Sequence, residues 1–475
     1  MWIINLQTYD SPISIVKYLP FIITSTFLYS QDLEMNPVLE YGYESDSEQY
    51  HIESAAVHDF EVGFIGSYSR KKLNIQTYLA YHLIQGPVHN QSQFTPVQGL
   101  HWIWKDPGLG KKQKNYYVSD MQVQYGDTSS YIYLNKWDKH WGPGVRSLTA
   151  SNKIPAFPHF GFKWSVIDQI QIEYFHGQLR SGIVDSSYLN YFKEGKTLLT
   201  MRNIAGHRLD WQPLKKWIFS ISELVIYANR SLEMAYLLPF IPFFPVQNYL
   251  NDTDNILMSA DVQYFYQNNI RIYGSFIMDE WSPSYTFNKD NHNWFGWQAG
   301  IDWKDIYLQE DQFRLEYTWT DHGMYHHRFE VNDVYSWGYP VGFWAGPHAE
   351  EIYADYSFSL GDNQIEILIS NAKRGEYTDS MRIDQYSGRP SDIPVYERFG
   401  TDNSESCGDC VGTVESKHLM RLSVYRKFNQ KLGMYVRYSF IDWENAGFEP
   451  ENPLSDDVLP DITKHSIGFG LRYRY

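Results

Sequence analysis

The strongest constraint on the fold is an alternation of apolar and polar residues that recurs along the chain. In HSIGFGLRYRY, Ile467, Phe469 and Leu471 fall on one face, whereas Arg472 and Arg474 fall on the other. Because successive side chains of a β-strand point to opposite faces, this segment is predicted to be a two-faced strand. The same alternation occurs in KLGMYVRYSF, QFRLEYTWT, LNIQTYLAYH, YVSDMQVQY, QIQIEYF, EIYADYSFSL and NQIEILIS. Each segment is close to the roughly 9–11 residues that a tilted strand needs to cross a bilayer.

The connections between these strands alternate in length. Short turns are predicted near residues 70–71, 126–127, 166–168, 212–215, 267–269, 309–311, 361–362 and 428–430. Long connections are predicted over residues 83–114, 137–157, 178–199, 229–255, 280–296, 321–350, 372–415 and 443–463. A soluble β-sandwich shares the alternating faces, but short turns at one end and long loops at the other are typical of outer-membrane barrels. The sequence therefore predicts an all-β fold, a transmembrane antiparallel β-barrel.

The number of strands follows from the same pattern. It gives roughly 17 strands from about residue 61 onward, and bacterial outer-membrane barrels contain an even number. PVLEYGYES, residues 37–45, is the best candidate for one more, so about 18 strands are expected in a single domain over residues 31–475. Ahead of it, Lys17 precedes the mostly apolar YLPFIITSTFLY and the small residue Ser30. Residues 1–30 are therefore predicted to be a cleaved signal peptide.

Composition excludes several classes of protein. No stretch approaches the roughly 20 apolar residues of a membrane-spanning helix. The net charge is −16 and no basic stripe offsets it, so nucleic acid is not an expected partner. Cys407 and Cys410 in SCGDC lack a second pair for zinc, and a local disulfide in an oxidising compartment is favoured. NDTDN, residues 251–255, is either an ordinary turn, the favoured interpretation, or a Ca²⁺ loop.

The inside of the predicted barrel carries charges of both signs. Arg208 and Asp210 would lie there together, as would Glu173, Arg314, Glu316, Asp355, Arg421, Arg437, Arg472 and Arg474. Mutual pairing that stabilises the wall is favoured over a selectivity or binding surface, because buried charges persist where they find partners. In LLPFIPFFPV, residues 237–246, three prolines exclude a helix interior and a central strand. This segment and the tryptophan-rich loops are expected to fold inward and occlude the lumen.

The most distinctive stretch is NKWDKHWGPGVRSLTASN, residues 135–152, which continues from a strand into a long outer loop. Gly142 and Gly144 around Pro143 predict a stiff turn that holds a cluster together. The candidate polysaccharide-binding residues are Trp137, Asp138, His140, Trp141 and Arg146 here, with Trp344 and His348 in a second outer loop. Indole faces beside hydrogen-bonding groups suit sugar rings. The alternative, slightly favoured for the tryptophans, is that they anchor the loop inside the barrel mouth.

This segment, with AGHRLDW, PFFPVQNYLNDTDN, RLEYTWT and YPVGFWAGPHAEEIYADYSFSL, resembles the capsule assembly Wzi family of bacterial outer-membrane proteins. The similarity spans roughly residues 50–475, and the order of the motifs is quite specific. The resemblance implies an occluded barrel of about 18 strands that acts as a surface lectin. Such a protein attaches capsular polysaccharide to the outer membrane, with no enzymatic activity and no cofactor. The loop with Cys407 and Cys410 departs from the family.

Two other functions are alternatives to the lectin. A porin-like channel for saccharide uptake is the main alternative, because a barrel of this size can enclose a water-filled lumen. An enzyme is not expected, because no G-x-S-x-G, H-E-x-x-H or P-loop pattern occurs. The net negative charge of the chain would repel an anionic glycan unless Lys136, Lys139 and Arg146 outweighed it locally. A neutral glycan would not be repelled.

The expected location is the bacterial outer membrane, with the long loops on the extracellular side. The expected partners are surface or capsular polysaccharide, outer-membrane lipid and, through the aromatic Tyr475, the barrel-insertion machinery.

Overall fold

The structure is a computed structural model, and it describes residues 33–46, 56–86, 93–100, 113–185, 198–279, 293–376, 413–450 and 459–474. The predicted signal peptide, the pair Cys407 and Cys410, and Tyr475 lie outside the described residues. In the described part, no helix is both long and apolar enough to cross a membrane.

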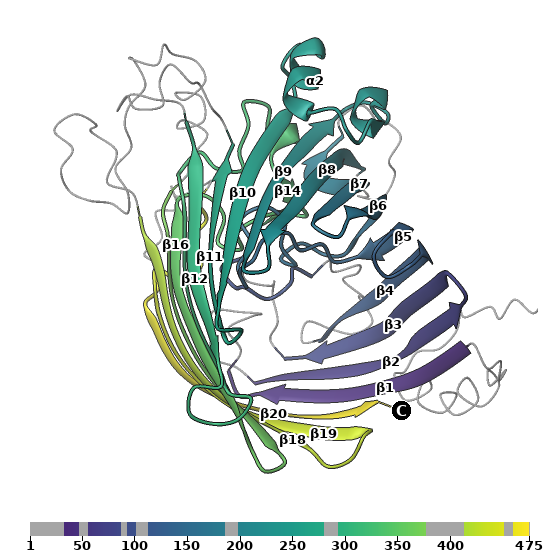
Figure 1. The fold of residues 1–475 in the computed structure, drawn as a ribbon. Coiled ribbons are helices and arrows are strands. Elements are labelled where there is room, and N and C mark those ends of the chain that lie inside the picture. The colour runs from purple at the N-terminus through teal and green to yellow at the C-terminus, as the bar shows by residue number, and fades with distance from the viewer. Residues whose placement is uncertain are drawn as a thin grey trace, which may run out of the picture.

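An 18-stranded antiparallel sheet closes on itself, because β1 pairs with both β2 and β20 (Figure 1). Its strands are β1 (Leu33–Glu44), β2 (Val57–Arg70), β3 (Leu73–Gln85), β4 (Gln113–Gly126), β5 (Tyr131–Trp137), β6 (Phe157–Ile167), β7 (Ile170–Val184), β8 (Leu199–Leu214), β9 (Trp217–Ala228), β10 (Asn255–Tyr266), β11 (Ile270–Met278), β12 (Phe295–Lys304), β13 (Gln312–Thr320), β16 (Ala349–Leu360), β17 (Asn363–Arg374), β18 (Glu415–Lys427), β19 (Leu432–Glu444) and β20 (Ile462–Arg474). The predicted barrel and its expected first strand are confirmed.

The lengths of the connections are also as predicted. Short turns such as 71–72 and 361–362 lie at one end, and the long connections lie at the other. Some turns are displaced by a few residues. β8 continues through Gln212 to Leu214, so the predicted turn at 212–215 moves to 215–216, and β6 continues to Ile167, so the predicted turn at 166–168 moves to 168–169. Short turns mark the periplasmic end of such a barrel and long loops mark the extracellular end.

The wall has an apolar outer face and a polar inner face. On β20, Ile467 is 57% exposed whereas Ser466 is 5% exposed, as the alternation predicts. Charges on the inner face pair with one another: Arg314 binds Asp302 and Asp355, Arg437 binds Glu44, Arg472 binds Glu40, and Arg208 binds Asp210 and Asp261. Mutual pairing of these charges is confirmed.

Long loops fill the lumen with a hydrophobic core. Residues 93–100, 138–156 and 321–348 fold inward, and we call them the plug. The last of these contains η4 (Glu330–Asn332) and a hairpin of β14 (Tyr335–Ser336) and β15 (Tyr339–Pro340). Plug residues that form one buried cluster with the inner wall include Phe94, Trp141, Leu148, Tyr325, Val341, Phe343 and Trp344. The occlusion expected from the sequence is therefore present.

The segment LLPFIPFFPV does not join the plug, and that expectation was wrong. It lies in the β9–β10 connection, which contains η2 (Met234–Leu237) and α2 (Phe243–Tyr249). Pro245 is the third helical residue, where its missing N–H is not needed.

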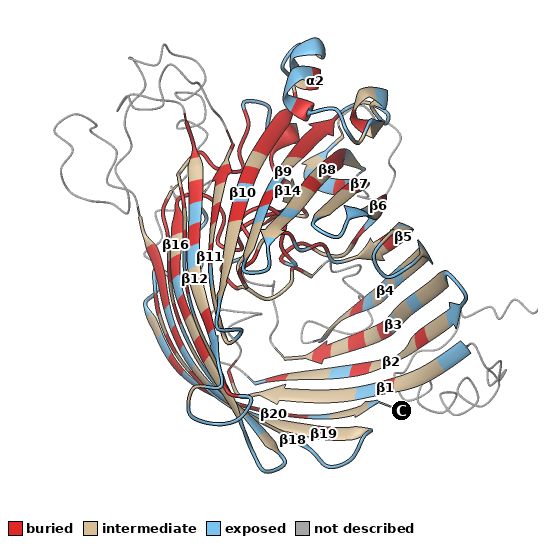
Figure 2. Ribbon diagram, in the orientation of Figure 1, coloured by how far each residue is buried: buried red, intermediate tan, exposed pale blue. Residues whose placement is uncertain are grey.

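We call residues 233–250 the outer flap, because this part of the connection packs on the outside of the wall. Phe243 stacks on His207, and Tyr236 packs on Tyr227. These partners alternate along their strands with inward-facing residues such as Ile226. Buried residues gather at the ends of β8, β9 and β10 nearest α2 (Figure 2).

Candidate functional site

Trp141 anchors the first long segment of the plug. Its indole Nε1 donates to Glu173 Oε2 at 3.1 Å, and its ring meets the edge of Phe175. Lys139 pairs with the same carboxylate. A Cβ on Gly206 of the wall would lie 2.9 Å from the Trp141 ring, so the absence of a side chain there makes room for the indole. Trp141 is 3% exposed, which favours an anchoring role over ligand contact.

Arg146 joins the plug to β16 through a buried ion pair. Its Nε and Nη2 donate to the two oxygens of Glu351 at 2.9 and 3.1 Å. Trp344 Nε1 and Ser370 Oγ donate to the same carboxylate, each at 2.6 Å. Burial opposes a charge on Arg146, but the Glu351 carboxylate outweighs it and raises the pKa of the guanidinium. One acid therefore fixes two plug segments.

The stiff turn predicted around Pro143 also has a partner on the wall. The backbone N–H groups of Val145 and Arg146 donate to Glu316 at 2.9 and 2.8 Å, and Tyr273 Oη donates to it at 2.7 Å. A Cβ on Gly144 would collide with Glu316. Glycine at this position lets the backbone approach the carboxylate closely. The turn therefore packs directly against the inner wall.

Arg202 of β8 holds the third plug segment by hydrogen bonds to the backbone. Its guanidinium donates to the carbonyl oxygens of Glu330, Val331 and Tyr335 at 2.6, 2.6 and 2.8 Å. Tyr325 Oη donates to the carbonyl oxygen of Leu148 at 2.7 Å, which ties this segment to the first. The plug is thus a connected unit.

A cavity of about 260 Å³ lies between the plug and neighbouring outer loops. Its lining includes Gln93, His326, Tyr335, Trp344, Arg374 and Glu449. Arg374 is the last residue of β17, at the extracellular end, and it pairs with Glu415. Aromatic surfaces, an amide and charged groups of both signs therefore meet in one cavity, which we call the outer cavity.

The seven predicted binding residues do not form one surface. Three are buried (Trp141, Trp344 and His348), Trp137 and Arg146 are half-buried, and Asp138 and His140 are exposed. The His348 ring lies 2.9 Å from the carbonyl oxygen of Glu376, and Asp138 accepts the Gln98 amide at 2.6 Å. Trp344 is the member of this set that lines the outer cavity.

Sequence reasoning missed the other residues of the outer cavity. Gln93, His326, Tyr335 and Glu449 come from three separate connections, and Arg374 ends a strand. No local pattern joins them. The available signal was the alternation along β17, which puts Arg374 at the extracellular end of that strand.

The segment NDTDN forms a turn stabilised by ion pairs. Asp254 is fully buried and binds Arg230 at 2.8 and 2.5 Å, and Tyr236 Oη donates to it at 2.7 Å. Asp252 binds Arg328 at 3.0 Å. Among the described residues, no group of His, Cys, Asp and Glu has an arrangement that could hold a metal ion. These contacts favour the ordinary turn.

Comparison with known proteins identifies the family. The sequence model of the family described as capsule assembly protein Wzi matches residues 112–453. This chain belongs to the Wzi family. Among curated protein sequences, none is similar enough to match it. The Wzi family and the closed wall together place the protein in the outer membrane.

The solved structure of Wzi from Escherichia coli agrees with the fold of this Wzi-family barrel. The Wzi structure from Escherichia coli is described as an outer-membrane protein involved in group 1 capsule assembly and a carbohydrate-binding β-barrel. The two sequences are 10% identical, and the two structures superpose with a TM-score of 0.57. The match covers 98% of this chain and 89% of the Escherichia coli chain. Pseudomonas aeruginosa OprD, at 10% identity, covers 94% and 96% of the two chains with a TM-score of 0.44. Acinetobacter baumannii OccAB2, at 8% identity, covers 94% and 98% with a TM-score of 0.46.

Anchoring by Trp141 predicts a large loss of stability on substitution. Trp141→Ala is expected to lower the free energy of unfolding by about 3–5 kcal/mol, because it leaves a void in the core and removes a donor from buried Glu173. Trp137→Ala, at a half-buried position, is the matched control and should cost clearly less. Urea unfolding followed by tryptophan fluorescence measures both. Equal losses would argue against a special anchoring role for Trp141.

Proposed function

We propose that this protein is a surface lectin that binds capsular polysaccharide, or another exopolysaccharide, and attaches it to the cell surface. The single observation that carries the proposal is the outer cavity, in which aromatic and hydrogen-bonding groups meet at the extracellular mouth of a filled barrel. Membership of the Wzi family supports it. The protein acts by binding, without catalysis and without a cofactor.

The outer cavity suits a sugar in both shape and chemistry. Half-buried Tyr335 offers apolar surface to the C–H groups of a pyranose ring, and the exposed side chains of Gln93 and Glu449 supply hydrogen bonds for its hydroxyl groups. Trp344 and Arg374 are buried and bind Glu351 and Glu415, so they form part of the cavity wall. Its volume of about 260 Å³ lies just below the roughly 300–1,000 Å³ of small-molecule pockets. We infer that it holds a short unit of a polymer that continues over the outer surface.

Charge pairing favours a neutral stretch of polysaccharide. The three cations that an anionic glycan would require are all in ion pairs: Arg146 with Glu351, Lys139 with Glu173 and Lys136 with Asp120. The whole chain carries a net charge of −16. The negative charge of the protein would therefore repel an acidic polymer, and these three paired side chains would do little to compensate.

The candidate residues from the sequence divide between two roles in this proposal. Trp344 contributes to the outer cavity, whereas Trp141 and Arg146 hold the plug that shapes it. The filled lumen argues against the porin-like channel, because a hydrophobic core of plug and wall residues occupies the path that a saccharide would follow.

A deletion strain tests the function directly. We expect it to synthesise its polysaccharide normally but release it into the medium, because the surface attachment is lost. Polysaccharide is measured in the cell-bound and soluble fractions, and a plasmid copy of the gene should return it to the cells. Unchanged cell-bound polysaccharide in the deletion strain would contradict the proposal.

A further inference from the structure

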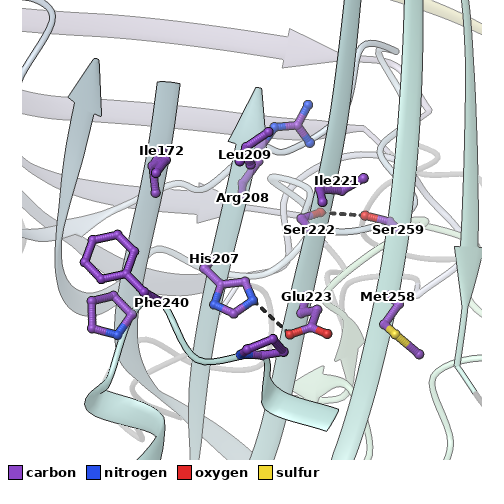
Figure 3. Close-up of a pocket in the computed structure, with 12 residues that line it drawn as sticks. Ile172, His207, Arg208, Leu209, Ile221, Ser222, Glu223, Phe240, Met258 and Ser259 are labelled. Carbon is purple, nitrogen blue, oxygen red and sulfur yellow. Dashed lines mark hydrogen bonds and ion pairs between the residues drawn. The ribbon is translucent and has the colours of Figure 1, made fainter. Parts of the chain in front are cut away.

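A second cavity lies on the other side of the wall. It has a volume of about 510 Å³, within the roughly 300–1,000 Å³ of ligand pockets. Its lining includes Ile172, Leu209, Ile221 and Met258 from β7–β10, and Phe240 and Pro242 from the outer flap. Figure 3 shows His207 and Glu223 between these two sides. We call it the flap pocket.

The flap pocket faces the membrane. Leu209 and Ile221 alternate with Arg208 and Ser222, whose side chains bind the inner-face residues Asp261 and Ser259. Ile221 is 60% exposed and Phe240 is 62% exposed, so apolar surface continues from the wall into the mouth of the pocket. The pocket is therefore continuous with the apolar face that meets lipid.

The depth of the pocket corresponds to the outer leaflet. From Leu214, at the periplasmic end of β8, to His207 is seven residues. At about 3.3 Å per residue and a strand tilt of about 40°, this step is roughly 18 Å along the membrane normal. The apolar band of such a barrel is about 25 Å tall. His207 thus lies in the outer half of the band, where the acyl chains of outer-leaflet lipids reside.

His207 presents an unsatisfied polar atom to this apolar pocket. Its Nε2 lies 2.8 Å from Glu223 Oε2, and its ring stacks on Phe243 with centroids 4.3 Å apart. Within the described part of the chain, the buried Nδ1 has no hydrogen-bond partner. In Figure 3 this nitrogen is on the side of the ring that faces Phe240. Because Nε2 donates to the Glu223 carboxylate, Nδ1 is an acceptor. A buried polar atom without a partner is costly, so a ligand group that donates a hydrogen bond to Nδ1 would be stabilising.

We propose that the flap pocket binds an acyl chain of an outer-leaflet lipid, with a hydrogen-bond donor of that lipid, such as a hydroxyl group, at His207 Nδ1. The surroundings of the pocket supply such chains at high local concentration, and its wall offers them apolar contacts. A bound lipid would also fix the outer flap against β7–β10. The proposal rests on the membrane location and is independent of the lectin function.

The test uses the full-length protein, purified in detergent and stripped of lipid, with binding counted by native mass spectrometry. Rough lipopolysaccharide is the probe in one arm and palmitoyl-oleoyl phosphatidylethanolamine in the other, which distinguishes the two lipid sources. We expect tight binding of at least one probe. Leu209→Trp, which fills the pocket, and Phe240→Ala, which removes part of its cover, should each weaken that binding at least about tenfold.

Leu315→Trp is the matched control, because it places the same ring at a lipid-facing position on β13, away from the pocket. It should bind lipid like the wild type. Phe240→Ala alters an exposed side chain of the flap and decides the question if Leu209→Trp fails to fold. Absence of lipid binding by the wild type, or wild-type binding by Phe240→Ala, would overturn the proposal.

The role of His207 has its own variant. His207→Phe retains a ring against Phe243 but removes Nδ1, and we expect a several-fold weaker affinity for the bound probe. An unchanged affinity would overturn the assignment of a lipid hydrogen-bond donor to this nitrogen.

Discussion

Glu351→Ala is expected to turn the filled barrel into a conducting one. The side chain of Glu351 is fully buried, and it binds Arg146 from one plug segment and Trp344 from another. Its removal leaves the Arg146 guanidinium buried without its counter-ion, which costs about 3–5 kcal/mol. We expect the plug to dissociate from β16, because this exposes the guanidinium to water and removes the cost. A stable ion conductance should then appear in planar bilayers, whereas the wild type should show none.

The neighbouring acid provides the control for this experiment. Glu350 lies on the opposite face of β16, where its carboxylate accepts the Tyr317 hydroxyl at 3.0 Å. Glu350→Ala removes a carboxylate from the outer face without touching the plug, so it should remain non-conducting. A double variant, Arg146→Met with Glu351→Leu, removes both charges and should recover much of the plugged state. A closed Glu351→Ala barrel would show that other contacts alone hold the plug.

Gln93→Trp is expected to abolish attachment of polysaccharide while leaving the barrel intact. Gln93 lines the outer cavity, yet it is exposed and outside the buried cluster of the plug. An indole at this position occupies the space that we assign to a sugar. The affinity of the purified protein for the polysaccharide of its own cells should fall at least about tenfold, or roughly 1.4 kcal/mol.

Glu330→Trp is the matched control, because this exposed residue belongs to the plug but not to the lining of the outer cavity. Its polysaccharide binding should match the wild type, and both variants should show the same unfolding transition as the wild type. If Gln93→Trp binds as the wild type does while a deletion strain still sheds polysaccharide, the lectin uses another surface. Trp137 and Asp138 would then be the first residues to substitute.

The wall was predictable from sequence because its rules are local. A strand that separates lipid from a polar interior must alternate, and Ile467 beside Ser466 shows this in two residues. The lengths of the connections then fixed the direction of each strand. The first strand is also predictable, because a barrel of this kind requires an even number of strands.

The loops were less predictable because their partners are distant in the chain. The sequence placed Trp141 and Arg146 in a stiff turn, but gave no sign that Glu173 and Glu351 would receive them. LLPFIPFFPV was assigned to the wrong side of the wall, since its apolar residues fit either side. The signal that could have corrected this is His207, a polar residue on the lipid face of β8, which proves to lie beneath Phe243.

The contacts of the turn around Pro143 impose an order on biogenesis. The hydrogen bonds from Val145 and Arg146 to Glu316 span 171 and 170 residues, and that from Arg146 to Glu351 spans 205. Contacts so distant along the chain form only after the intervening segments have been organised. The turn leaves the ribosome before β13 and β16. Its partners Glu316 and Glu351 are in place only when both strands have joined the sheet. Plugging is therefore a late step of insertion, completed when most of the wall has already assembled.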